Sequence, residues 1–219
     1  MNLMKPFIFF ILAVFSLQTE AQCRYCNSYE DYKTDNWKEL PSIDIKHYSN
    51  SKQLWTNKHE YQLKTDLKST KKMLSKEALI IQKGDTMYVN LRYLRCEKEN
   101  FGKGLAYGIP LIGKKILFIS KRVDKKSSNN QLFSYLLFGV MGSLISSSLN
   151  IKNNACYILD TGRNGKYTDV LIIDDEVMKK LLVNDKELLD KYFMIADQNE
   201  RETPSNILPL LKEKGLIEQ

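Results

Sequence analysis

The segment ALIIQKGDTMYVNLRYLR, residues 78–95, decides the fold class because it has the pattern of a β-hairpin. Apolar and polar side chains alternate over 86–95, which is the period of a half-buried strand. The tripeptide Lys-Gly-Asp at 83–85 interrupts the apolar run and supplies the glycine that a three-residue connection needs. The segment therefore predicts two antiparallel strands, 78–82 and 86–95.

Further strands are expected on the C-terminal side of this hairpin. They are 105–109, 115–120, 155–159 and 168–173, the last two joined by an Asn-Gly turn. From residue 174 the apolar period becomes helical, and the caps predict helices over 176–182, 186–195 and 206–214. The expected fold is α+β, an antiparallel sheet of about six strands with an apolar helical insertion and C-terminal helices packed on it.

That insertion, residues 127–151, contains no charged residue, although Asp, Glu, Lys and Arg make up 27% of the chain. Its apolar part, 132–149, is as long as a membrane-spanning helix. Serines and glycines dilute its hydrophobicity, and the basic residues before it are on the wrong side for an exported membrane protein. A helix or helix pair buried in a domain is the main interpretation. A membrane-embedded or membrane-docking segment, or irregular or strand structure, stays open.

The N-terminus has the pattern of a secretory signal peptide over residues 1–21. Lys5 precedes an apolar run at 7–17, and Ala21 ends a passable cleavage site. An N-terminal membrane anchor, or lipidation at Cys23, is the alternative. We therefore expect an exported protein that is periplasmic, associated with the outer membrane, or secreted.

The cysteines all follow the predicted cleavage site, where an oxidising compartment favours disulfides. They are Cys23, Cys26, Cys96 and Cys156. Three connectivities are open. A local bridge or tether at the CxxC of 23–26 is favoured over redox catalysis, because no strand is expected before it. A Cys96–Cys156 bridge would join the two sides of the insertion. A zinc site lacks support, because the second pair is not a CxxC.

Residues 22–77 are expected to form an irregular, aromatic-rich lead-in with one short helix at 66–76. The remainder, 78–219, is expected to be a single α+β domain with a helical tail at 174–214. Both histidines, His47 and His59, lie in the lead-in, and we interpret them as ordinary surface or half-buried residues.

Two loops imitate ligand-binding motifs. Residues 108–114 fit GxxxxGK, but Lys115 stands where the phosphate-binding loop needs Ser or Thr, and a strand follows instead of a helix. The turn from Asp160 lacks calcium ligands at loop positions 3 and 12. No catalytic residue, metal or cofactor is therefore expected.

Three short motifs, YVNLR at 88–92, FGKG at 101–104 and CYILD at 156–160, support a resemblance to a known family. The chain resembles a family of uncharacterised exported proteins from Bacteroidota over about residues 78–214. The resemblance implies export and a shared domain, and it transfers no site residues.

The net charge of +7 would favour anionic partners such as an envelope surface or a glycan, but lysine-rich solvated faces, which need no partner, are the stronger explanation. No nucleic-acid partner is expected. The main hypothesis is an envelope-associated, non-enzymatic binding or interaction module. The alternatives are a membrane-engaging protein that uses 132–149 and a hydrolase whose site is not readable from sequence. Any ligand face is expected around Arg92, Lys103, Tyr107 and Arg163.

Overall fold

A computed structural model describes residues 22–40, 43–48, 59–65, 67–123, 154–162 and 166–217. The predicted signal peptide at 1–21 and the uncharged insertion at 127–151 lie outside the described residues.

The predicted α+β class is confirmed, and among the described residues the main sheet has ten strands, more than the six or so expected. They are β1 (Cys23–Cys26), β2 (Lys38–Leu40), β3 (Asp44–His47), β4 (Tyr61–Lys64), β5 (Ile80–Lys83), β6 (Thr86–Asn90), β9 (Leu105–Leu111), β10 (Lys115–Lys121), β11 (Asn154–Leu159) and β13 (Leu171–Ile172). A second sheet contains β7 (Leu94–Cys96), β8 (Glu99–Asn100) and β12 (Thr168–Asp169).

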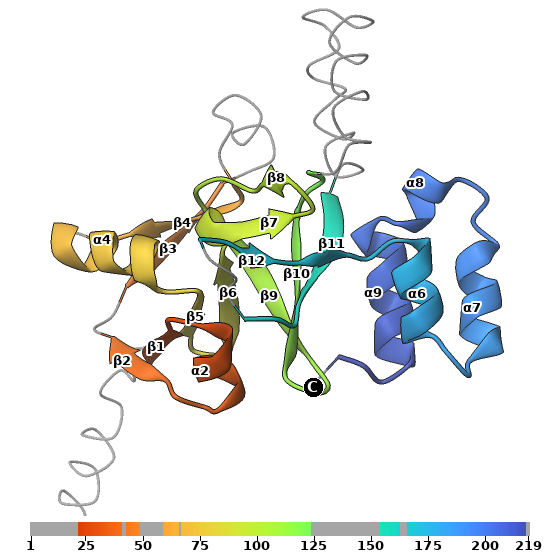
Figure 1. Cartoon of the computed structure of the whole chain (residues 1–219), viewed down its shortest axis with the longest axis horizontal. Coiled ribbons are helices and arrows are strands. Elements are labelled where there is room, and N and C mark those ends of the chain that lie inside the picture. Colours follow the sequence, from red (N-terminus) through yellow and green to blue (C-terminus); the bar gives the residue numbers. More distant parts are fainter. Residues whose placement is uncertain are drawn as a thin grey trace, which may run out of the picture.

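The main sheet forks at β9. Its strand order is β13-β11-β10-β9-β6-β5-β1-β2, and β4 also pairs with β9 and with β3. β10 pairs with the C-terminal part of β9, from Gly108 to Leu111, whereas β4 pairs with its first residue, Leu105. The outer edge of β9 is therefore shared by two strands that run to different parts of the molecule (Figure 1).

The first predicted hairpin forms, with two differences. Its loop has two residues, Gly84 and Asp85, and Gly84 has a φ of 57°, which glycine adopts without strain. The second strand ends at Asn90, where a 3₁₀ turn, Leu91–Tyr93, redirects the chain into the second sheet. The Asn90 side chain accepts from the Arg92 N–H and donates to the Ala78 carbonyl at 2.7 Å, so it stabilises this break in the strand.

The second predicted hairpin, 155–159 with 168–173, is divided between the two sheets. Leu171 and Ile172 pair antiparallel with β11, as expected. Thr168 and Asp169 instead pair parallel with β7, and the Asp169 carboxylate accepts from Arg95 at 2.8 Å.

The structure of residues 22–77 differs from the expected irregular lead-in. β1 lies between β5 and β2 inside the main sheet, and β3 pairs with β4. These strands have three or four residues each. Such short strands carry too few residues for alternation to be visible, and distant strands complete their pairing.

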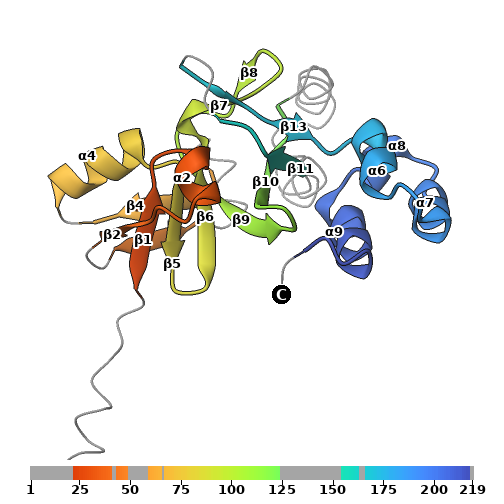
Figure 2. The same ribbon diagram turned by 60° about the horizontal axis from the view of Figure 1, so that its bottom comes forward.

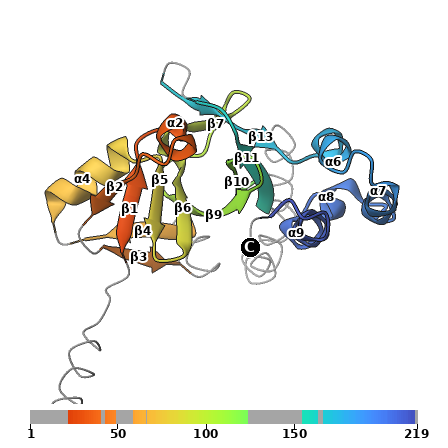
Figure 3. The ribbon, with the colours of Figure 1, turned by 90° about the horizontal axis from the view of Figure 1, so that it is seen from below.

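Helices cover both ends of the sheet. They are α2 (Tyr29–Lys33), α4 (Lys68–Glu77), α6 (Asp175–Leu181), α7 (Lys186–Phe193), α8 (Gln198–Arg201) and α9 (Pro204–Glu213). Two of the predicted caps form: Asp174 accepts from the Val177 N–H and Asp185 from the Leu188 N–H. Thr203 precedes α9 without a side-chain cap bond. Helices α6 to α9 gather at one end and α4 lies at the other (Figures 1 and 3).

Three apolar cores hold these layers together. The first lies between one face of the sheet and α2 with the second sheet (Figure 2). It contains Tyr29, Phe118 and Tyr157. The second, around Tyr192 and Ile207, joins β10 and β11 to the C-terminal helices. The third lies between the sheet and β3, β4 and α4. The second and third cores lie on the same face of the sheet, at its two ends.

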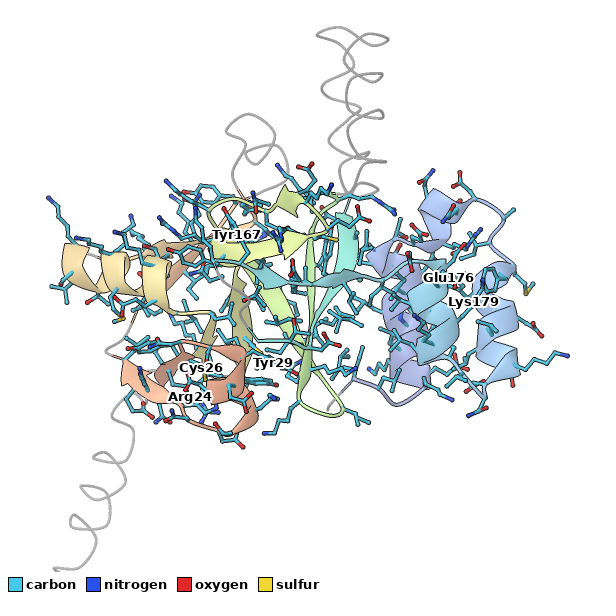
Figure 4. All side chains as sticks on the ribbon, viewed as in Figure 1. Arg24, Cys26, Tyr29, Tyr167, Glu176 and Lys179 are labelled. Atoms are coloured by element: carbon cyan, nitrogen blue, oxygen red, sulfur yellow. The ribbon has the colours of Figure 1, made fainter. Side chains whose placement is uncertain are left out.

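The predicted disulfides do not form: all four cysteines are buried thiols. Cys23 and Cys26 lie three residues apart in β1, so they point to opposite faces of the sheet, into the third and first cores. Cys96 belongs to the first core and Cys156 to the second, again on opposite sides. Cys26 lies beneath α2, near Tyr29 (Figure 4).

Candidate functional site

A cleft lies beside β9, between the end of the β5–β6 hairpin and α9. Its volume is about 820 Å³. It is lined by Gln82, Asp85, Tyr107, Gly108, Ile109, Pro110, Leu208, Pro209, Lys212 and Ile217. The cleft exists because β9 continues past the hairpin that pairs with it. Apolar walls with a few polar groups are typical of small-ligand sites.

The backbone at the cleft is not suited to accept an added strand. The Leu91 N–H donates to the Gly104 carbonyl at 2.9 Å. In an antiparallel ladder every second residue directs its backbone N–H and C=O toward the same neighbour, so from Gly104 onward these residues face β6, and Pro110 is the last of them. β6 begins at Thr86, and Pro110 therefore lies beyond its ladder. Because proline has no N–H, this edge offers only a carbonyl to a partner strand. Recognition in the cleft must therefore rely on side chains.

The chain end closes the far side of the cleft. Ile217 forms a β-bridge with Leu111, and the Ile112 N–H donates to the Leu216 carbonyl at 2.9 Å. Within α9, Leu208 and Pro209 face the cleft. Pro209 has no N–H to continue the helical ladder, and its ring adds to the apolar wall.

Tyr107 is the exposed aromatic residue of the cleft, with 40% of its surface accessible. It lies directly opposite Tyr88 in the ladder of β6 and β9. The Tyr88 ring is half-buried, and burial, with a smaller effect of Tyr107, raises the pKa of its hydroxyl. The Tyr61 ring packs edge-on against Tyr88, with 5.3 Å between centroids. Tyr107 is therefore the open end of a row of aromatic rings on one face of the sheet.

Polar groups stand on two sides of Tyr107. The Gln82 amide is fixed, because it accepts from Arg24 Nε and donates to the Gly84 carbonyl, both at 3.0 Å. Asp85 in the hairpin turn and Lys212 on α9 line the cleft from different elements. Neither forms an ion pair with any described residue. The cleft thus presents an aromatic ring, a carboxylate and an ammonium group to a ligand.

The predicted ligand face is only partly assembled. The hydrogen bond from the Leu91 N–H to the Gly104 carbonyl places Arg92 and Lys103 on adjacent segments of the backbone. The Arg92 guanidinium lies 5.5 Å from the centroid of the Tyr93 ring. Tyr107 lies four residues beyond Lys103, roughly 13 Å along an extended strand. Arg163 lies outside the described residues. Of the four, Tyr107 is the residue that lines the cleft.

Two further properties of the described residues bear on the site. Within the described ranges, no group of three or more His, Cys, Asp or Glu side chains could hold a metal ion. No helix in the part of the chain that the structure describes is long and apolar enough to span a membrane. The segment 132–149 is outside that part.

Residues 24–217 match the model of a family of unknown function, DUF6563. The chain belongs to the DUF6563 family. The match begins before residue 78, so the DUF6563 domain includes most of β1 and all of β2 to β4, which the short motifs at 88–160 did not reveal. No curated protein and no solved structure matches this DUF6563 chain.

Most of the cleft could not be found from the sequence. Asp85 looks like an ordinary turn residue, and Leu208, Pro209 and Lys212 look like a helix with one solvated side. They meet at the cleft because α9 packs beside β9, a contact between segments about 100 residues apart. The one available signal was Pro209, because a proline inside a short helix has to be justified by its surroundings.

Proposed function

We propose that this DUF6563 protein is an exported, envelope-associated binding module without catalytic activity, and that its ligand-binding site is the cleft at Tyr107. The observation that carries the proposal is the exposed Tyr107 ring on the floor of an apolar cleft, beside Asp85 and Lys212, which form no ion pair with the described residues.

The chemistry of the cleft favours a saccharide with an acidic substituent. The C–H face of a sugar ring packs on an aromatic ring such as Tyr107, and its hydroxyls bond to carboxylate and amide groups such as those of Asp85 and Gln82. The Lys212 ammonium would pair with the acidic substituent, and the net charge of +7 attracts polyanions over a longer range.

Export is supported by the sequence pattern of residues 1–21. Expression of the full-length chain with N-terminal sequencing of the product tests it. A mature chain that begins at Gln22 is the expected result, and an intact Met1 in the folded product contradicts it.

Binding is tested by titrating the isotope-labelled mature protein with a neutral and an acidic oligosaccharide, each a chitotriose-length chain, and following the backbone amide resonances. We expect the acidic oligosaccharide to shift the backbone amide resonances of residues 107–109 and 210–212. Tyr107→Ala should abolish the shifts and Tyr107→Phe should keep most of them, because the ring supplies the contact. Tyr93→Ala, outside the cleft, is the matched control.

Two outcomes would reject the saccharide site. One is the absence of shifts in the cleft with both oligosaccharides. The other is binding to vesicles of anionic phospholipid that Tyr107→Ala leaves unchanged, which would favour the membrane-engaging alternative.

A further inference from the structure

The fork at β9, between β10 and the segment of His59 and Glu60 that leads into β4, encloses a second, much smaller cavity. β9 and β10 pair from Leu111 and Lys115 to Gly108 and Phe118, and then separate. The fork is lined by His59, Glu60, Leu91, Leu105, Ala106, Ile119, Ser120, Lys121 and Asn154. Its volume is about 10 Å³, which is close to the space that one water molecule needs.

Ser120 places an unsatisfied hydroxyl in this fork. The residue is 6% exposed, and its Oγ has no hydrogen-bond partner among the described residues. Buried hydroxyls nearly always have a partner, because losing hydrogen bonds to water without replacement is unfavourable. The Ser120 hydroxyl is both a donor and an acceptor, so a water molecule can satisfy it in either direction.

The fork also has the further polar groups that a buried water needs. The half-buried Lys121 and the Asn154 side chain line it from the last pair of the β10–β11 ladder. His59 and Glu60 line it from the other side, just before β4. A buried water commonly makes about three hydrogen bonds, and these groups supply donors and acceptors on both arms of the fork.

His59 is held rigidly where it borders the fork. Its Nε2 donates to the Phe101 carbonyl at 2.5 Å. The side chain also occupies the space that a Cβ on Gly104 would fill, since that Cβ would lie 2.5 Å from the His59 Cβ. The FGKG loop therefore fixes one wall of the cavity and keeps its shape.

We propose that the fork is a binding site for a single water molecule, which bonds to Ser120 Oγ and joins β10 to the His59–Glu60 arm. The fork lies at the point where the main sheet divides, and the two arms make no ladder bonds to each other there. The bound water replaces the missing ladder contact between them.

The test compares Ser120→Ala with Ser69→Ala, a serine on the exposed side of α4. If water bonds to Ser120, its removal breaks that bond, and we expect the melting temperature to fall by about 2–4 °C, with no change for Ser69→Ala. An unpartnered hydroxyl gives the opposite result, because its deletion is neutral or stabilising. An unchanged or raised melting temperature for Ser120→Ala would therefore overturn the proposal.

A second measurement does not depend on a variant. A high-resolution crystal structure of the wild-type protein should show a density peak within hydrogen-bond distance of Ser120 Oγ, inside the fork. A direct bond from Ser120 Oγ to a protein group, or a fork without such a peak, would also overturn the proposal.

Discussion

Arg122, which follows β10, forms an ion pair with Glu202, with 2.5 Å between Arg122 Nη2 and Glu202 Oε2. Only 11% and 1% of these two side chains are exposed. Glu202 also accepts from the Gln198 amide at 2.8 Å. The pair therefore connects the end of β10 to the junction of α8 and α9, at a site that is largely shielded from water.

Removal of the Glu202 charge should destabilise the protein strongly. Glu202→Gln removes the buried negative charge that pairs with the Arg122 guanidinium, and breaking a buried pair costs about 3–5 kcal/mol. Urea unfolding followed by circular dichroism measures the change in the free energy of unfolding. The control is Glu176→Gln, because Glu176 pairs with Lys179 on the surface of α6 at 2.8 Å (Figure 4). Exposed pairs contribute about 0–1 kcal/mol. Equal effects of the two variants would contradict the role given to burial.

Gly104→Ala should destabilise the protein through a single contact. The new Cβ would lie 2.5 Å from the His59 Cβ, and overpacking of this kind costs about 1–3 kcal/mol. Gly162→Ala is the matched control, because no atom of the described residues lies within 4 Å of its added Cβ. Combining Gly104→Ala with His59→Ala should recover part of the loss in a double-mutant cycle. Simple additivity of the two variants would show that the contact is not responsible.

The protein should lose stability as the pH falls below the ordinary range of histidine. Burial lowers the pKa of His59 in the folded state, outweighing its bond to the Phe101 carbonyl. The stability that the neutral His59 side chain contributes is complete at pH values above its pKa in the unfolded chain, about 6.5. This contribution declines as the pH falls from there toward the lower pKa of His59 in the folded protein. For one proton the slope is at most about 1.4 kcal/mol per pH unit.

Urea unfolding at several pH values between neutrality and about pH 5 measures this slope. His59→Gln should reduce the dependence of the free energy of unfolding on pH over this range. The control, His47→Gln, replaces an exposed side chain and should keep the pH dependence of the wild-type protein. A slope retained in His59→Gln would assign the effect to other groups.

The cysteine thiols should stay reduced and unreactive in the native protein. Burial raises the pKa of the Cys26 and Cys156 thiols to about 12, so thiolate at neutral pH is negligible. A thiol reagent should react slowly with the folded protein and with four groups per chain after denaturation. Protein purified from an oxidising compartment gives the strictest test of whether the thiols stay reduced. Recovery of two thiols or none after denaturation would show that the bridges expected from the sequence form after all.

The hairpin at 78–95 shows how far local pattern reaches. Alternation and one glycine were sufficient to predict β5 and β6, since both signals lie within the paired residues. The helix caps at Asp174 and Asp185 were predictable for the same reason. β1 was missed, because a four-residue strand such as Cys23–Cys26 shows no clear period and acquires its partners from β5 and β2.

Likewise, one residue of the candidate site can be proposed from the sequence, and others need the tertiary structure. Tyr107 could be proposed from sequence as an aromatic residue beside a glycine-rich loop. Lys212 could not, because a lysine on a short helix resembles any solvated lysine until the helix is placed. From the sequence alone His59 looks like an ordinary surface or half-buried residue, but its ring packs against Gly104 and its Nε2 bonds to Phe101, more than 40 residues away in the chain.

By itself, the sequence determined the α+β class, the central hairpin and the capped C-terminal helices, because each depends on residues within a few positions of one another. Only the tertiary structure decided the fork at β9, the cleft at Tyr107 and the opposite orientations of Cys23 and Cys26. Each of these depends on which distant segments become neighbours, and that is decided by burial of apolar surface over the whole chain.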